Sequence, residues 1–269
     1  MNKFDDYIKE SNIIYMICKI RAKYAKKRNE KHLIYSLSGD ENLNYHTDTP
    51  INDEEKKLSE ILPSRKKWKK LNKDNRYNKK GQRINSVKYN TLSLQITINW
   101  YRKNEPNAPF LIELDNFIME IKDAINDKNY KIKSPEIRPI LKGDKKKEET
   151  KEKNICRPIS IYPLKDRIIL SIVNKYLTDI FDCFFYEKSF AFRSSKGEKR
   201  NHHSSIEEIL EHKSKYKGKR LWVSECDISK FYDSVKHTVI KRLFIRLQKK
   251  VEYSMSNLFD ERASNLFYK

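Results

Sequence analysis

An aspartate at the end of an apolar run is the side chain best placed to do chemistry in this sequence. The run covers residues 221–235 and reads LWVSECDISKFYDSV. If it is a strand with side chains alternating between faces, one face includes Trp222 and Cys226 and suits a core. Asp227 then stands at the exposed end of the strand, beside the backbone carbonyl of Ile228. Such oxygen ligands suit Mg2+, which binds through one or two carboxylates together with substrate phosphates.

The same aspartate has a simpler interpretation, because an acidic residue before a turn is common. On that alternative Asp227 ends a strand and binds no metal. Asp233 and Ser234 resemble a helix start, and residues 235–247 have helical spacing. We therefore expect Asp233 to cap a helix.

Positive charge dominates the chain, whose 269 residues carry a formal net charge of +21 and a sequence pI of about 9.6. This balance predicts a polyanionic partner. Charge is densest in residues 65–88, where eleven Lys or Arg accompany a single acid, Asp74, and where Trp68 and Tyr77 are interleaved. Cations neutralise phosphates and aromatic faces stack on bases, so this segment suits single-stranded nucleic acid. The alternatives are a solvated surface or a disordered arm.

Composition also excludes some classes of protein. No apolar run approaches the ~20 residues that span a bilayer, so we expect no membrane partner. The apolar stretch at residues 13–20 is interrupted by Lys19 and is no signal peptide. The cysteines are widely spaced, lack zinc spacing and predict reduced, mostly buried thiols in a cytoplasmic protein. They are Cys18, Cys156, Cys183 and Cys226.

The elements that must position these side chains follow from the hydrophobic spacing, which predicts a mixed α+β chain. Residues 91–101 suit either a strand or a buried helix turn, residues 33–50 are polar and turn-rich, and residues 142–154 are too charged to pack. The apolar tail, residues 251–269, suits contact with other polypeptide or packing on the chain's own core. We expect helices at residues 5–28, 50–62, 110–125, 166–181, 205–212 and 235–247, and strands at residues 137–141 and 155–161.

Three sequence blocks, taken in order, resemble the reverse transcriptase domain of bacterial polymerases: group II intron proteins, retrons and defence-associated enzymes. CRPISIYPLKDRIILSIV, residues 156–173, is similar to the fingers block, in which an arginine-proline strand precedes an aspartate-arginine pair. KSFAFRSSKG, residues 188–197, is similar to the block that follows. ECDISKFYDSVKH, residues 225–237, looks like the first catalytic motif of the palm. The resemblance covers about residues 110–247.

The resemblance implies a right-hand polymerase fold that makes DNA on an RNA template, with a DNA or RNA primer, dNTPs and two Mg2+ ions. Transferred by position, Asp227 would hold both metals and the Ile228 carbonyl would assist. Tyr232 would lie under the sugar and reject a 2′-hydroxyl. Its alternative role is core packing.

The cations of the first two blocks receive roles in the same way. Arg157 would bind the triphosphate, because guanidinium matches phosphate geometry. Lys165 and Arg167 would contact the nucleotide or the template backbone, with a surface cation as the alternative. Arg193 would contact the template, with a structural salt bridge as the alternative.

The resemblance divides the chain into a basic, mainly helical N-terminal extension (residues 1–105), fingers (106–220) and the first part of a palm (221–269). It is also incomplete. A reverse transcriptase continues with a glycine-containing motif and a hairpin bearing two adjacent aspartates, whereas the last glycine here is Gly218 and the only adjacent aspartates are Asp5 and Asp6. One carboxylate cannot assemble a two-metal site. We therefore expect further sequence or a second chain to complete the palm.

Two function hypotheses follow. The first is a reverse transcriptase domain that is catalytic only when completed. The second is a non-catalytic RNA-binding protein derived from a reverse transcriptase, with a place in antiviral defence. Salt-sensitive RNA binding that needs neither Mg2+ nor Asp227 would favour the second.

Overall fold

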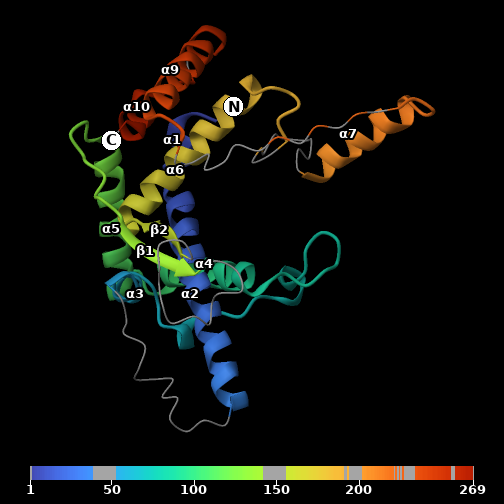
Figure 1. Ribbon diagram of the computed structural model, residues 1–269. Helices are drawn as coiled ribbons and strands as arrows, with labels where there is room; N and C mark the ends of the chain where they lie inside the picture. The colour runs from blue at the N-terminus through green and yellow to red at the C-terminus, as the bar shows by residue number, and fades with distance from the viewer. Residues whose placement is uncertain are drawn as a thin grey trace. The chain divides into compact units, whose positions relative to one another are not determined.

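The computed structural model describes residues 2–38, 53–141, 156–190, 193, 202–220, 222, 224, 226, 234–255 and 258–268. Most of these residues are helical, and the described part contains one two-stranded sheet (Figure 1). In chain order the α-helices and strands are α1 (Phe4–Tyr7), α2 (Glu10–Ser38), α3 (Asp53–Glu60), α4 (Ser86–Asn104), α5 (Pro109–Asn126), β1 (Glu136–Leu141), β2 (Cys156–Ile161), α6 (Leu164–Phe181), α7 (His202–Lys215), α9 (His237–Ser254) and α10 (Glu261–Phe267). Short 3-10 helices are η1 (Arg65–Lys67), η2 (Lys73–Arg76) and η4 (Asp182–Phe184).

The chain divides into two compact units, and residues of α6 belong to both. One unit comprises Met1–Tyr7 with Ile172–Tyr268, and the other comprises Ile8–Ser171. The boundaries predicted from the sequence, after residues 105 and 220, differ from this division and stay predictions. The polymerase architecture of the two C-terminal segments likewise stays a prediction.

Helix α5 forms where the sequence predicts it, because its apolar side chains recur with helical period. Pro109 occupies the first turn, where a missing N–H costs no intrahelical bond. The six apolar residues expected on one face are all buried: Leu111, Leu114, Phe117, Ile118, Ile121 and Ile125. The shorter helix α3 is also confirmed, with three acidic residues in its first turn.

Helices α2 and α4 pack against each other and position the basic segment that lies between α3 and α4. The ambiguous residues 91–101 belong to α4, where Leu94, Ile98 and Tyr101 are buried at helical spacing. Asn85 caps the helix, since its side-chain oxygen accepts a hydrogen bond from the Lys88 backbone N–H at 2.9 Å. The first expected helix is broken into α1 and α2, and α2 extends to Ser38, so the turn-rich prediction is wrong for residues 33–38. The rest of that stretch lies outside the described residues.

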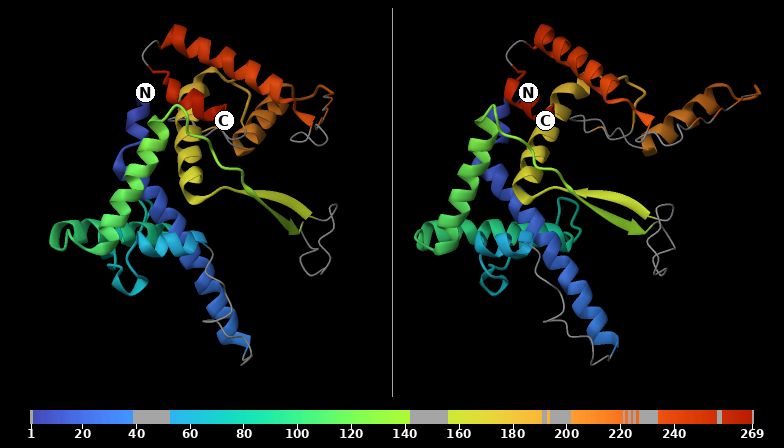
Figure 2. Two further views of the ribbon diagram at one scale, coloured as in Figure 1. Left: turned by 90° about the vertical axis from the view of Figure 1, so that its left-hand side faces the viewer. Right: turned by 60° about the vertical axis from the view of Figure 1, so that its left-hand side comes forward.

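The two predicted strands pair as an antiparallel ribbon, visible in Figure 2. The register runs from Glu136 opposite Ile161 to Leu141 opposite Cys156. Pro139 lies opposite Pro158. A two-stranded ribbon has only edge strands, which is where proline is tolerated. Residues 142–154, predicted as a charged loop, lie outside the described residues.

The unit formed by Met1–Tyr7 and Ile172–Tyr268 has an aromatic core. The ring of Tyr176 lies 4.8 Å from that of Phe4, and its hydroxyl accepts a hydrogen bond from the Asp260 backbone N–H at 2.8 Å. The ring of Phe267 stacks on Phe244 with centroids 4.0 Å apart. The apolar tail therefore packs on the chain's own core, which was one of its two predicted roles. Helix α7 confirms the predicted helix at residues 205–212 and extends it at both ends. Helix α9 confirms the last predicted helix but begins at His237 with Lys236 as its N-cap, so Asp233, which lies outside the described residues, does not cap it.

The strand predicted at residues 221–227 is wrong for the residues that the structure describes there. Residues 222, 224 and 226 are in no strand. The expected core side chains are exposed instead, with Trp222 at 85% and Cys226 also on the surface. The physical reason is the lack of a partner strand, since the other described elements of the unit that contains these residues are helices. A strand buries a face only against another element.

The prediction of mostly buried thiols holds for Cys18 and is wrong for Cys183 and Cys226, which are exposed. Burial raises the pKa of the Cys18 thiol to about 12. Cys183 is exposed because it lies in η4, on the short turn that ends α6.

Candidate nucleic-acid interface

The basic segment, residues 65–88, is held against α4 through its backbone. The Lys69 N–H donates to the Thr97 hydroxyl at 2.8 Å, and the Ser93 hydroxyl donates to the Lys69 carbonyl. Leu71 is buried beside these contacts. The segment is therefore fixed to the helix near its start, while most of its charged side chains stay outside. We call it the basic loop; Figure 1 shows its second half in teal, leading into α4.

The far part of the basic loop closes as a turn. The Asn78 N–H donates to the Gln82 carbonyl at 2.8 Å, and the Gly81 N–H donates to the Asn78 carbonyl at 2.9 Å. Gly81 has φ +71°, in the left-handed region that a side chain disfavours. A bridge between Tyr77 and Arg83 continues the turn. The structure thus shows a defined loop, and the alternative of a disordered arm is not what forms here.

Nine of the eleven cations of the basic loop are exposed. They are Arg65, Lys66, Lys67, Lys70, Lys73, Lys79, Lys80, Arg83 and Lys88. Aromatic rings lie among them, since Tyr77 is 53% exposed and the Lys69 ammonium lies 3.7 Å from the centre of the Trp100 ring. The Trp68 indole N–H donates to the Pro63 carbonyl at 2.9 Å, which fixes that ring. Exposed cations with fixed aromatic faces are the combination that binds a single strand.

The two cations of the fingers block already have carboxylate partners. Lys165 lies 3.5 Å from a Glu120 oxygen, and Arg167 pairs with Glu54. Both cationic side chains are about a third exposed. A phosphate would therefore compete with a carboxylate for each of them. The nucleotide roles of Lys165 and Arg167 stay predictions.

Asp166, between them, is buried and has a structural role. Its carboxylate accepts a hydrogen bond from the Tyr130 hydroxyl at 2.5 Å and one from the Lys133 N–H at 3.3 Å. Burial and this carboxylate raise the pKa of Tyr130 above its usual value. These bonds hold residues 130–133 against the first turn of α6, which begins at Leu164 rather than at the aspartate.

Arg193 is in the salt bridge that the sequence left as its alternative role. Its guanidinium contacts an Asp182 carboxylate oxygen at 3.0 Å, the Asp182 carbonyl at 2.6 Å and the Tyr186 carbonyl at 2.8 Å. The side chain is only 5% exposed. Three acceptors and this burial leave little of the guanidinium for a template.

For the remaining predicted site residues, the positions of the side chains are not described. Arg157 lies in β2 opposite Ile140. Asp227, Ile228 and Tyr232 lie outside the described residues, so the metal and sugar roles stay predictions. In the part of the chain that is described, no group of three or more His, Cys, Asp or Glu side chains is arranged to hold a metal ion.

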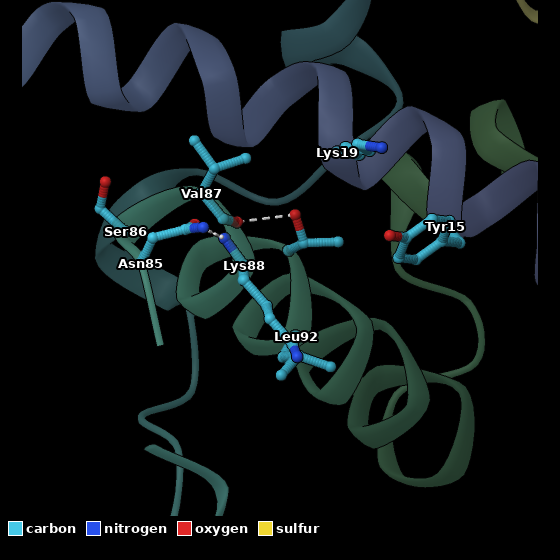
Figure 3. A pocket seen from close by; sticks show the side chains of 8 residues that line it. Tyr15, Lys19, Asn85, Ser86, Val87, Lys88 and Leu92 are labelled. Atoms are coloured by element: carbon cyan, nitrogen blue, oxygen red, sulfur yellow. Dashed lines mark hydrogen bonds between the residues drawn. The ribbon is translucent and has the colours of Figure 1, made fainter. Parts of the chain in front are cut away.

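Sequence reasoning missed a pocket of about 490 Å³ beside the basic loop (Figure 3). Tyr15 and Lys19 of α2 line one side, and residues 85–88, Thr91 and Leu92, at the start of α4, line the other. The Lys19 ammonium lies 5.9 Å from the centre of the Tyr15 ring. About seventy positions separate the two sides, so no local pattern marks the pocket.

Comparisons with protein-family models, with curated proteins and with solved structures find no match to this chain. Among the described helices, none combines the length and the apolar composition needed to cross a bilayer.

Proposed function

We propose that this chain supplies the fingers and the first part of the palm of an RNA-directed DNA polymerase, and that further polypeptide completes the palm. In this proposal Asp227 and the Ile228 carbonyl hold Mg2+, Arg157 binds the dNTP triphosphate and Tyr232 lies against the sugar. Bound Mg2+ would lower the activation barrier to nucleotidyl transfer by stabilising the negative charge of the transition state. The support is the series of three sequence blocks, together with an arginine-bearing ribbon that leads directly into α6.

The observation that carries the need for a partner is the apolar surface of α7. Its apolar side chains Ile206, Ile209 and Leu210 form one stripe, at helical spacing, and each is more than half exposed. Burying such a side chain contributes about 1.5–3 kcal/mol. A stripe of this kind is typical of a helix face that packs on another element.

Helix α9 repeats the pattern in the same unit. Val239, Ile240 and Leu243 are exposed on neighbouring turns, while Phe244 and Val251 are buried. Trp222, just before Asp227 in the sequence, is exposed as well. The segment proposed to bear the metal ligand therefore lies in the unit that carries uncovered apolar surface. Polypeptide that covers this surface is proposed to bring the remaining carboxylates.

Primer extension tests the proposal. The chain is purified alone and with the product of the DNA that follows its gene, and each sample is given an RNA template, a primer, dNTPs and Mg2+. We expect extension only from the combined sample, because Asp227 alone supplies one carboxylate. Absence of extension from both samples would contradict the polymerase proposal.

The defined basic loop favours a second candidate function, RNA binding without catalysis. The described backbone contacts that fix this loop to α4 are with Ser93 and Thr97, and its far turn closes through contacts within the loop itself. RNA affinity that is unchanged by EDTA and by Asp227→Ala, with no extension in any sample, would select this candidate. We propose the cytoplasm as the compartment in either case.

A further inference from the structure

We infer that the pocket between α2 and the first turns of α4 binds one nucleotide of a single-stranded RNA whose neighbouring phosphates lie on the basic loop. The inference rests on RNA binding, which both candidate functions share. It adds a defined subsite for a base and its phosphate to a surface otherwise made of exposed cations.

The dimensions and lining of the pocket fit a nucleotide. Its volume of about 490 Å³ lies in the range of small-molecule sites. Val87 and Leu92 give apolar surface, and Ser86 and Thr91 give hydroxyls. Tyr15 is 43% exposed, so part of its ring is available to stack on an unpaired base.

The charge of the pocket selects an anion. Lys19 lines the pocket from α2 and Lys88 from α4, and none of the described residues that line it is acidic. Within the described residues neither ammonium is in an ion pair with a carboxylate. A phosphate in the pocket would therefore meet two cations that no described carboxylate neutralises.

Chain continuity links the pocket to a strand rather than to a free nucleotide. Asn85 and Ser86 line the pocket, and Arg83, two residues before Asn85, is an exposed cation of the basic loop. A strand whose base entered the pocket would find the loop's cations along its next phosphates. An isolated nucleotide would use the pocket and leave the loop empty.

Photo-cross-linking and fluorescence anisotropy on the full chain test the subsite. The probe is a fluorescent oligouridine of about 12 nucleotides, within the span of typical single-strand sites. A copy carrying 5-iodouridine is irradiated with the wild-type protein, and the linked peptide is identified by mass spectrometry. We expect the peptide that contains Tyr15.

The matched variants are Tyr15→Ala, Tyr15→Phe and Tyr186→Ala. Tyr186 is 75% exposed and lies outside both the pocket and the loop. We expect Tyr15→Ala to weaken binding at least about 5-fold, because one base loses its stacking partner. Tyr15→Phe keeps the ring and Tyr186→Ala removes an unrelated one, so both should bind within about 2-fold of wild type.

The outcomes separate the subsite from the function. Wild-type binding with no loss in Tyr15→Ala, or with cross-links only to the loop, would overturn the subsite and leave RNA binding intact. Failure of the wild-type protein to bind the probe would overturn RNA binding and the subsite together. Equal affinity for the same DNA sequence would keep the subsite and remove its preference for RNA. Cross-linking uses the unaltered chain, so it decides the matter even if Tyr15→Ala unfolds.

Discussion

Removing positive charge from the basic loop should weaken RNA binding, and the size of the loss should depend on how many exposed lysines are replaced. We choose Lys66, Lys70, Lys79 and Lys80, which are exposed and whose side chains make no ion pair among the described residues. Replacing all four by glutamine lowers the formal net charge from +21 to +17. The fold should persist, because surface substitutions of this kind usually change stability by less than about 0.5 kcal/mol each.

The magnitude follows from counterion release. Each phosphate contact with a single strand adds about 0.7 to the slope of log K against log salt. Four lost contacts should reduce that slope by about 2.8, which at about 0.15 M salt is a loss of about 200-fold in affinity. The assay is anisotropy of a labelled single-stranded RNA over a salt series, with circular dichroism to confirm the fold.

A charge-matched control separates position from net charge. Lys131, Lys213, Lys249 and Lys250 are also exposed, lie outside the basic loop and give the same net charge of +17 when replaced by glutamine. The control should keep most of the wild-type slope. Equal losses in the two variants would refute the reasoning, because the basic loop would then be no more than part of a generally positive surface.

Three further predictions concern stability. Arg193→Ala should lower the free energy of unfolding by about 3–5 kcal/mol, since it leaves the buried Asp182 carboxylate unpaired, while RNA affinity stays unchanged; normal stability in urea with weakened RNA binding would restore the template role. Burial raises the pKa of Tyr176 to about 12, above an unfolded value of about 10, so this hydroxyl contributes stability below pH 10 that is lost between about pH 10 and 12. In Tyr176→Phe the free energy of unfolding, measured in urea, should fall by about 2–3 kcal/mol less than in the wild type between about pH 10 and 12. An equally steep fall in the variant would contradict the assignment. Ile209→Ser should leave stability within about 0.5 kcal/mol while reducing co-purification with the polypeptide that completes the palm; a large drop in stability would show that this face is covered within the chain.

Local patterns predicted the elements whose neighbours matter least. Helix α5 carries its apolar residues at helical spacing, and each of the two strands is a short segment bounded by turn-forming residues. The sequence alone therefore predicted all three elements. Residues 91–101 were ambiguous because threonines and isoleucines suit both states, and packing of α4 on α2 decides in favour of helix.

The wrong predictions concern tertiary contacts, that is, which element or side chain each predicted segment packs against. Residues 221–227 have the composition of a strand, but Trp222 is exposed because no described neighbour pairs with the stretch. The acids that meet Lys165 and Arg167 are Glu120 and Glu54, 45 and 113 residues away. Such pairs depend on tertiary packing, which a single sequence does not reveal.

The pocket shows the same limit at the candidate site. Tyr15 belongs to a helix in which the spacing of apolar residues predicted a hydrophobic core, and Lys88 is the last cation of the basic loop. Neither residue type indicates a nucleotide site by itself. Packing of α2 on α4 brings them to one cavity.

The central claim is that Asp227 supplies half of a magnesium centre, and one substitution in the completed assembly tests it most directly. Asp227→Asn keeps the size of the side chain and removes its charge, and Asp233→Asn makes the same change at a nearby aspartate that is given no metal role. We predict that primer extension on RNA falls at least about 10³-fold for Asp227→Asn, since metal stabilisation of the transition state amounts to several kcal/mol. The Asp233→Asn assembly should retain most of its activity. Extension that survives Asp227→Asn would contradict the account.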